Sequence, residues 1–206
     1  LQHRPRPEIE CLSPVEISML RNAEQRSIYY NVFLFLMYSG MRTGEMIALD
    51  WRDLDYTKQV IHIRRNFYRG ELTTPKTGYG IRDLPLTNQV LSTLPRRQLA
   101  GSVFKNTMGR LIDYRILLTS WHRQQESAGF PNLYGLHALR HTFATTLIRN
   151  GADAKTVSML LGHADVSITL NYYCHSDLED KRRALSLLKQ TRQDRFARAE
   201  QEAADP

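Results

Sequence analysis

The stretch IYYNVFLFLMYSG, residues 28–40, decides what kind of fold this chain can have. Between Ile28 and Ser39 almost every side chain is apolar, which is typical of a helix buried on all sides in the centre of a domain. Gly40 ends this helix, because glycine readily adopts the left-handed conformation found at helix C-termini. We therefore expect the rest of the chain to be arranged around a central helix.

Further helices are predicted on both sides of this central one. Upstream, Ser13, Pro14 and Glu16 occupy the N-cap, N1 and N3 positions of a helix start. Downstream, the segment MRTGEMIAL (41–49) begins a new helix. Apolar residues at helical spacing then predict helices at residues 113–128, 136–149, 153–161, 166–174 and from 177 onward.

The hydrophobic pattern changes in the middle of the chain. The segment VIHIR (60–64) alternates with period two, and IRDLPL (81–86) is typical of a second short strand. Between them, Gly70, Gly78 and Gly80 supply turns. The predicted fold class is therefore mostly α with a small antiparallel β-sheet.

The composition favours a globular protein with a polyanionic partner. At 206 residues, 42% of them hydrophobic, the chain can bury a core and need not exceed one domain. Lys and Arg number 28 against 21 Asp and Glu, which gives a net charge of +7 and a pI of about 9.6. This charge makes nucleic acid the first partner to consider, although solubility alone explains many such charges.

Two further features argue against other classes of protein. The longest apolar run, residues 32–38, is much shorter than the roughly 20 residues that cross a bilayer, so we expect no membrane span. Cys11 and Cys174 stand far apart without CxxC or CxxH spacing, which argues against a disulfide framework and against a zinc site. We expect a cytoplasmic protein without a metal.

One predicted helix presents an imidazole and a guanidinium together. In YGLHALRHTFATTL (134–147), Leu139, Phe143 and Leu147 form the buried stripe. His137 and Arg140 lie three residues apart on another face. Such a pair also occurs on helices that are merely solvated, so further cations are needed to give it a chemical meaning.

Two other segments supply such cations. In YSGMRTGEMIAL (38–49), Arg42 starts a helix and Glu45 follows one turn later to hold its guanidinium, although an ordinary intrahelical ion pair has the same spacing. In TPKTGYGIRDLPL (74–86), Lys76 lies at the turn end of the predicted hairpin. A lysine there can reach over a ligand or only guard a sheet edge.

A turn between two helices carries the last candidates. In SMLLGHADVSITLNYYCH (158–175), Gly162 suits a helix C-terminus and Asp165 suits an N-cap, so His163 lies on a tight turn. The helix that follows carries Tyr172 and Tyr173. Together the candidates suit a phosphodiester: arginines hold phosphate oxygens, lysine and histidines transfer protons, and a tyrosine attacks phosphorus.

With these motifs in place, the chain resembles the catalytic domain of the tyrosine recombinases, the phage integrase family. The motifs SGMRTGE, TPKT, HALRHTFAT, LGH and Y-x-H follow one another in the family's order between residues 12 and 175. The ending ITLNYYCH (168–175) is most similar to integrases of conjugative transposons and temperate phages. The resemblance implies the recombinase catalytic-domain fold and site-specific DNA recombination through a 3′-phosphotyrosine, without metal, ATP or another cofactor.

The resemblance also implies a role for each matching residue. Arg42 and Arg140 would clamp the scissile phosphate, and His163 would hydrogen-bond it. Lys76 would protonate the departing 5′ oxygen, and His137 would be the acid–base partner of the nucleophile.

Other polar residues of these motifs are expected to act less directly. Glu45 would orient Arg42 without reacting. His141, beside Arg140, is expected to be structural or to contact the DNA backbone. The candidates for DNA contacts are Arg64, Thr77 and Arg82.

Only one of the two adjacent tyrosines is expected to be the nucleophile. Successive helical residues point about 100° apart, so Tyr172 and Tyr173 do not both face the phosphate. The family's usual ending is Tyr, one residue, then His, which Tyr173-Cys174-His175 matches. We therefore expect Tyr173 to attack, Tyr172 to pack or face DNA, and Cys174 to be a small buried side chain.

The domain organisation and partners follow from the same resemblance. Residues 1–11 are expected to form a linker, residues 12–176 the catalytic domain, and residues 177–206 a C-terminal helix with a polar tail. This last segment would be exchanged between neighbours in a homotetramer on DNA. The expected partners are double-stranded DNA attachment sites, other copies of the chain and accessory DNA-bending proteins.

Two other functions remain open on the sequence. The segment AKTVSMLLGHADVSITLNYY (154–173) also resembles a helix-turn-helix, as in a DNA-binding module without catalysis. A repressor of that kind would not need Arg42 or Lys76, but a catalytically silent relative would retain the fold. A type IB topoisomerase would share the chemistry and relax supercoils instead of exchanging strands.

Overall fold

The computed structural model describes residues 10–24, 26–74 and 80–173, together with Arg182 and Leu185. Residues 1–173 form one compact unit, and residues 174–206 form a second one, in which the two described residues are helical. Lys76, Thr77 and Cys174 lie outside the described residues, as does most of the helix expected from residue 177.

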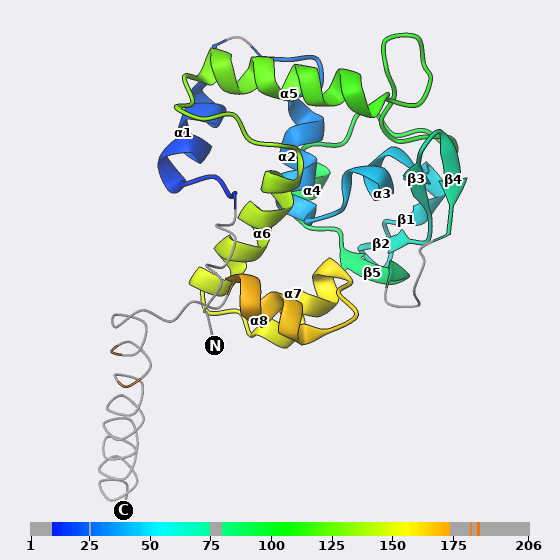
Figure 1. Cartoon of the computed structure of the whole chain (residues 1–206). Helices are drawn as coiled ribbons and strands as arrows, with labels where there is room; N and C mark the ends of the chain where they lie inside the picture. Colours follow the sequence, from blue (N-terminus) through cyan, green and yellow to red (C-terminus); the bar gives the residue numbers. More distant parts are fainter. Residues whose placement is uncertain (1–9, 25, 75–79, 174–181, 183–184, 186–206) are drawn as a thin grey trace, which may run out of the picture. The chain divides into compact units, whose positions relative to one another are not determined.

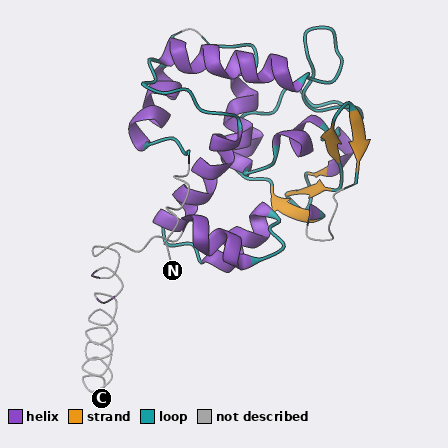
Figure 2. Ribbon diagram, viewed as in Figure 1, coloured by secondary structure: helices purple, strands orange, loops and turns teal. Residues whose placement is uncertain are grey.

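The first unit is mostly helical, with its strands gathered on one side (Figures 1 and 2). Its described α-helices are α1 (Pro14–Asn22), α2 (Tyr30–Ser39), α3 (Thr43–Ile47), α4 (Asn88–Leu91), α5 (Tyr114–Ala128), α6 (His137–Arg149), α7 (Ala154–Leu161) and α8 (Val166–Tyr173). Its strands are β1 (Leu54–Asp55), β2 (Val60–Ile63), β3 (Asn66–Tyr68), β4 (Glu71–Thr73) and β5 (Arg82–Pro85), and a 3₁₀ helix covers Trp51–Asp53.

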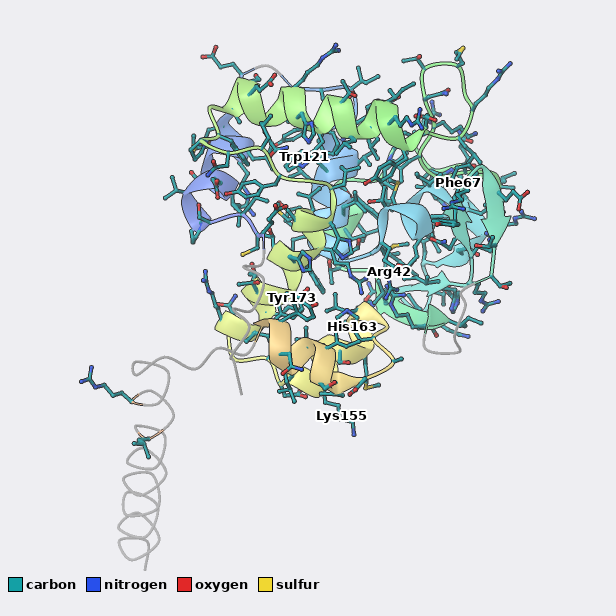
Figure 3. The ribbon with its side chains drawn as sticks, viewed as in Figure 1. Arg42, Phe67, Trp121, Lys155, His163 and Tyr173 are labelled. Carbon is teal, nitrogen blue, oxygen red and sulfur yellow. The ribbon has the colours of Figure 1, made fainter. Side chains whose placement is uncertain are left out.

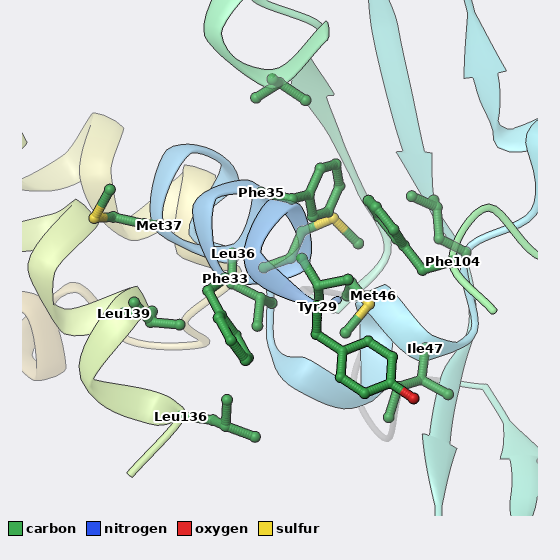
Figure 4. Packing of buried hydrophobic residues seen from close by; sticks show 14 of the residues in the cluster. Tyr29, Phe33, Phe35, Leu36, Met37, Met46, Ile47, Phe104, Leu136 and Leu139 are labelled. Atoms are coloured by element: carbon green, nitrogen blue, oxygen red, sulfur yellow. The ribbon is translucent and has the colours of Figure 1, made fainter. Parts of the chain in front are cut away.

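Helix α2 is the centre of the hydrophobic core, as its sequence predicts. Side chains leave it in all directions: Phe33 and Phe35 are fully buried on different sides, and residues of α3 and α6 pack against it (Figure 4). Each fully buried side chain of this size stabilises the fold by about 1.5–3 kcal/mol. Gly40 ends the helix in the left-handed conformation with a φ of 64°, and its N–H donates to the Leu36 carbonyl.

The surroundings of Gly40 leave no space for a larger residue at this position. A Cβ atom built there would lie 2.4 Å from Cδ1 of Phe143, a residue of α6. Helices α2 and α6 therefore meet where the chain turns into α3. This close approach sets the position of Arg42, two residues further on, against α6.

Local sequence signals explain most helix ends. Ser13 and Glu16 form a complete capping box at the start of α1. Asp113 caps α5, and Asp153 caps α7. Gly162 ends α7 in the left-handed conformation, so the predicted turn between α7 and α8 is confirmed.

The β region contains more strands than the sequence predicts. Strands β2 and β5 pair antiparallel with Ile61 opposite Leu84, which confirms the predicted hairpin, and β1 extends the sheet on the other edge of β2. Strands β3 and β4 form a second antiparallel pair inside the connection from β2 to β5. Their alternation was missed because the strands are only three residues long and half exposed.

Helices α7 and α8 lie at one end of the first unit (Figure 1). Helix α6 runs from the region under α5 towards α7 and α8, and β5 lies beside α7 (Figure 1). The amide of Leu12 donates to the Thr142 hydroxyl of α6 at 2.8 Å, so the start of the predicted catalytic domain is fixed to this helix. In the described part of the chain, no helix is long and apolar enough to cross a bilayer.

Candidate active site

Arg42 and Glu45 are joined at the start of α3, as the sequence predicts. The Arg42 backbone N–H donates to Oε2 of Glu45 at 2.9 Å, and Nη1 donates to Oε1 at 2.8 Å. Glu45 is only 3% exposed. Burial raises the pKa of this carboxyl, but hydrogen bonds and charge from Arg82 and Arg42 outweigh that effect and lower it overall. A buried, ionised carboxylate therefore holds the arginine in place.

Arg82 is buried and bonded to groups inside the protein. Its side chain is 7% exposed, and its Nη1 and Nη2 atoms each donate to one oxygen of Glu45 at 2.9 Å. Its Nε atom donates to the Leu160 carbonyl at 2.7 Å. These bonds use most of the Arg82 donors inside the protein, so the expected DNA contact of Arg82 stays a prediction that its burial argues against.

Arg140 is a buried cation that donates hydrogen bonds to neutral carbonyl groups. It is 2% exposed and donates from Nη1 to the Gly40 carbonyl at 2.8 Å and from Nη2 to the Leu161 carbonyl. None of the ion pairs among the described residues includes it. Burial, and next the charge of Arg42, lower its pKa to about 9, so it remains charged at neutral pH. A buried charge without a carboxylate beside it favours the approach of an anion.

Three arginines converge on the carboxyl end of α7. The last carbonyls of a helix have no partner inside it and carry the negative end of the helix dipole. Here three successive carbonyls accept hydrogen bonds from arginines of three different elements: Leu160 from Arg82, Leu161 from Arg140 and Gly162 from Arg42. The end of α7 therefore fixes the three guanidiniums relative to one another.

His163 follows this helix end directly. Its Nδ1 atom is hydrogen-bonded to the Thr169 hydroxyl of α8 at 3.0 Å, which sets the direction of the ring. Burial, and next the charges of Arg140 and Arg42, lower the pKa of His163 to about 4. The imidazole is therefore neutral at physiological pH and lies among the cations (Figure 3).

Tyr173 points into the site and Tyr172 points away from it. Tyr173 is 8% exposed and Tyr172 is 41% exposed. The Tyr173 phenol oxygen is hydrogen-bonded to Nδ1 of His141. Burial raises the pKa of Tyr173 to about 12, although the charge of Arg140 partly offsets this effect. The buried tyrosine is the one that the sequence favours as nucleophile.

The histidine hydrogen-bonded to Tyr173 is His141. The acid–base role expected of His137 stays a prediction, and its imidazole ring meets that of His141 edge-on with centroids 4.7 Å apart. Burial, and next the charges of His137 and Arg140, lower the pKa of His141 to about 4. The spacing of four residues puts both imidazoles on one face of α6, so the sequence held a signal for His141 but no choice between the two histidines.

The remaining candidates stay predictions. Lys76 and Thr77 belong to residues 75–79, outside the described part of the chain. Arg64 follows β2 and is exposed, so it is free to meet a partner. Among the described residues, no group of three or more His, Cys, Asp or Glu is placed to hold a metal ion.

Known proteins with similar sequences are tyrosine recombinases and a transposase. The model of the phage integrase family matches residues 12–180. The chain is 31% identical to a XerC-like tyrosine recombinase of Caldanaerobacter subterraneus subsp. tengcongensis over 88% of its own length and 54% of the relative's. It is 26% identical to the transposase of transposon Tn916 from Enterococcus faecalis, over 80% of its own length and 46% of that protein's. The chain thus spans about half the length of the curated relatives it matches.

Solved structures share the fold. The Tn1549 transposon integrase, in complex with circular intermediate DNA, superposes with a TM-score of 0.74 at 24% identity, covering 91% of this chain and 68% of that one. The XerA recombinase superposes with a TM-score of 0.69 at 24% identity, covering 90% of this chain and 65% of that one. The predicted fold class is confirmed.

Proposed function

The chain belongs to the phage integrase family, and on that premise we propose that it is the catalytic part of a site-specific tyrosine recombinase. It cuts and rejoins double-stranded DNA through a covalent 3′-phosphotyrosine. One observation carries the proposal: the buried guanidinium of Arg140 and that of Arg42 share the carboxyl end of α7, and α8 brings Tyr173 to the same place. This is the arrangement that a phosphodiester needs in order to be held and attacked.

The proposed cleavage step uses each group once. Arg42, Arg140 and His163 bind the non-bridging oxygens of the scissile phosphate and stabilise the charge of the pentacovalent transition state. The phenol oxygen of Tyr173 forms a bond to phosphorus as the bond from phosphorus to the 5′ oxygen breaks. Lys76 gives a proton to the departing 5′ oxygen.

The phenol proton is accepted by a neutral imidazole of α6. His141 holds the phenol in the free protein, and His137 lies against His141 (Figure 3 shows the position of Tyr173). Rejoining is the reverse reaction with the 5′ hydroxyl of another strand. Since the phosphotyrosine keeps the energy of the broken bond, no ATP is required, and the arginines supply the charge that metal ions supply elsewhere.

Several partners belong to the same proposal. DNA attachment sites are the substrate, a homotetramer assembles on them, and the segment after residue 176 is exchanged between neighbours. Accessory DNA-bending proteins assist, and the reaction takes place in the cytoplasm. Support comes from the net charge of +7 and from relatives that are recombinases and a transposase.

The test is covalent trapping on a nicked suicide duplex, chosen from a random-sequence library for binding to the full chain. Wild type, Tyr173→Phe and Tyr172→Phe are compared, and the peptide attached to DNA is identified by mass spectrometry. We expect an adduct in wild type and Tyr172→Phe and none in Tyr173→Phe. An adduct on Tyr172 would mean that the proposed activity is right and that Tyr172 is the nucleophile.

Two outcomes would favour the other functions. The absence of an adduct in every protein, on DNA that is bound, would indicate a DNA-binding module without catalysis. Relaxation of supercoiled DNA without strand exchange between duplexes would indicate a type IB topoisomerase.

A further inference from the structure

Arg82 is the most extensively bonded arginine near the candidate active site. It begins β5, directly after the segment that contains Lys76, and its Nη1 atom also donates to the Gly80 carbonyl at 3.3 Å. With the two bonds to Glu45 and the bond to Leu160, its guanidinium links β5, α3 and α7. Such a planar fork across a carboxylate is a strong and directional contact.

The charge of Glu45 is what makes this contact important. Glu45 lies against Arg42 and Arg82, so the three side chains carry one negative and two positive charges. Without Arg82, the buried carboxylate would have Arg42 as its one remaining ion-pair partner among the described residues. An arginine neutralised in this way stabilises less of the charge that develops on the phosphate in the transition state, because its own charge is already compensated.

The contact with α7 has a second consequence. In the free protein, Arg42 and Arg140 donate to the carbonyls of Gly162 and Leu161. The bond from Arg82 to Leu160 would remain even if a phosphate drew these two donors away. It keeps the end of α7, and with it the His163 turn, in register with α3.

We propose that Arg82 is a positioning residue of the strand-transfer site. It neutralises Glu45 so that Arg42 keeps its charge for the phosphate, and it holds the carboxyl end of α7 while DNA is bound. It does not touch the DNA itself. This inference rests on the proposed recombinase function.

The test separates binding from chemistry in the full chain. Arg82→Met removes the charge and the fork, and the matched control is Arg110→Met, which changes an exposed arginine outside the candidate active site. DNA affinity is measured against salt concentration, and the rate of covalent adduct formation is measured in a single turnover at saturating DNA.

We expect the single-turnover rate to fall in Arg82→Met and to keep its wild-type value in the control variant. Arg82→Met lowers the single-turnover rate about 100-fold, the size of effect that misplacement of a catalytic group produces, with unchanged affinity. Its salt slope also stays that of wild type. Arg110→Met keeps the wild-type rate, affinity and salt slope. An Arg82→Met protein with lower affinity and a lower slope would show a DNA contact and overturn the proposal.

A rescue variant distinguishes positioning from a general loss of structure. In the double variant Arg82→Met/Glu45→Gln, the neutral amide no longer compensates the charge of Arg42. We expect the single-turnover rate of this variant to be at least about tenfold higher than that of Arg82→Met alone. The ratio of the Arg82→Met rate to the wild-type rate should also rise as the pH falls, because burial without Arg82 raises the pKa of Glu45 and protonation releases Arg42. The proposal is contradicted if the double variant is as slow as Arg82→Met and the ratio of the Arg82→Met rate to the wild-type rate does not change with pH.

Wild type is the reference for both hypotheses. If wild type forms no adduct on bound DNA, the proposed function fails and this inference fails with it. If wild type forms the adduct and Arg82→Met forms it at the same rate, the recombinase function stands and the role of Arg82 is wrong.

Discussion

The phenol oxygen of Tyr173 and Nδ1 of His141 form a hydrogen bond that joins α8 to α6 across 32 residues of sequence. Their ring centroids lie 5.6 Å apart. With a pKa raised to about 12, the phenol keeps its proton, and the imidazole, with a pKa lowered to about 4, is neutral and accepts the hydrogen bond. The contact fixes the rotamer of the proposed nucleophile before DNA arrives.

His141 is therefore predicted to matter for cleavage and not for DNA binding. His141→Phe keeps a ring and removes the acceptor, and we expect the single-turnover cleavage rate to fall about 10- to 100-fold with unchanged affinity. His141→Asn, whose amide can replace Nδ1, should recover part of the rate. The control is His122→Gln on α5, which should cleave like wild type. A rate unaffected by His141→Phe would remove His141 from the mechanism.

The stability of the protein is predicted to fall in mild acid. His141 and His163 have pKa values of about 4 in the folded protein, against about 6.5 in an unfolded chain. Between pH 6.5 and pH 4, roughly, the unfolded state binds protons that the folded state does not, so the free energy of unfolding decreases as the pH is lowered.

Chemical denaturation of wild type and His141→Gln at two pH values checks this effect. We expect the loss of stability from about pH 7 to about pH 5.5 to be smaller in His141→Gln, because one of the two histidines no longer titrates. This window lies above the ordinary range of the carboxyl groups. Equal losses in the two proteins would show that His141 has the same pKa in the folded and the unfolded state.

Cleavage is predicted to be independent of divalent metal. The cations around the proposed phosphate position are Arg42 and Arg140, which a chelator does not remove. With excess EDTA, the rate of adduct formation on the suicide duplex should remain within about twofold of the rate without it. A metal-dependent nuclease in the same buffer serves as the control and should stop. A loss of cleavage that Mg²⁺ restores would mean that the arginines alone do not supply the charge.

Gly40→Ala is predicted to destabilise the fold severely. The new Cβ would meet Phe143 at 2.4 Å in a residue with a φ of 64°, so we expect a loss of about 2–3 kcal/mol in the free energy of unfolding. The control is Gly70→Ala, where φ is 89° and no atom lies within 4 Å, so that backbone strain acts alone. Its loss should be about 1 kcal/mol. Equal losses would mean that Phe143 moves aside without cost.

Features that depend on residues close together in the chain could be predicted from the sequence. The caps Ser13, Asp113 and Asp153 lie within a few residues of the amides they bind, and Gly162 ends α7 by its own backbone preference. The position of Arg42 at the start of α3, held by Glu45, was predicted for the same reason.

Contacts between distant segments were the ones missed. Arg82 looked like an exposed hairpin residue because its partners Glu45 and Leu160 lie 37 and 78 residues away. The four-residue spacing of His137 and His141 does not decide which of them meets Tyr173, since that depends on how α8 packs against α6. The choice of Tyr173 over Tyr172 as the expected nucleophile came from the Tyr-x-His ending and not from periodicity.

The carboxyl end of α7 has a consequence for the entropy of DNA binding. A long arginine side chain loses about 2 kcal/mol of rotamer freedom when it is held in one conformation. Arg42 and Arg140 are already held by the Gly162 and Leu161 carbonyls in the free protein, so this freedom is lost during folding. If Arg42 and Arg140 hold the scissile phosphate as proposed, the two side chains need not be ordered first.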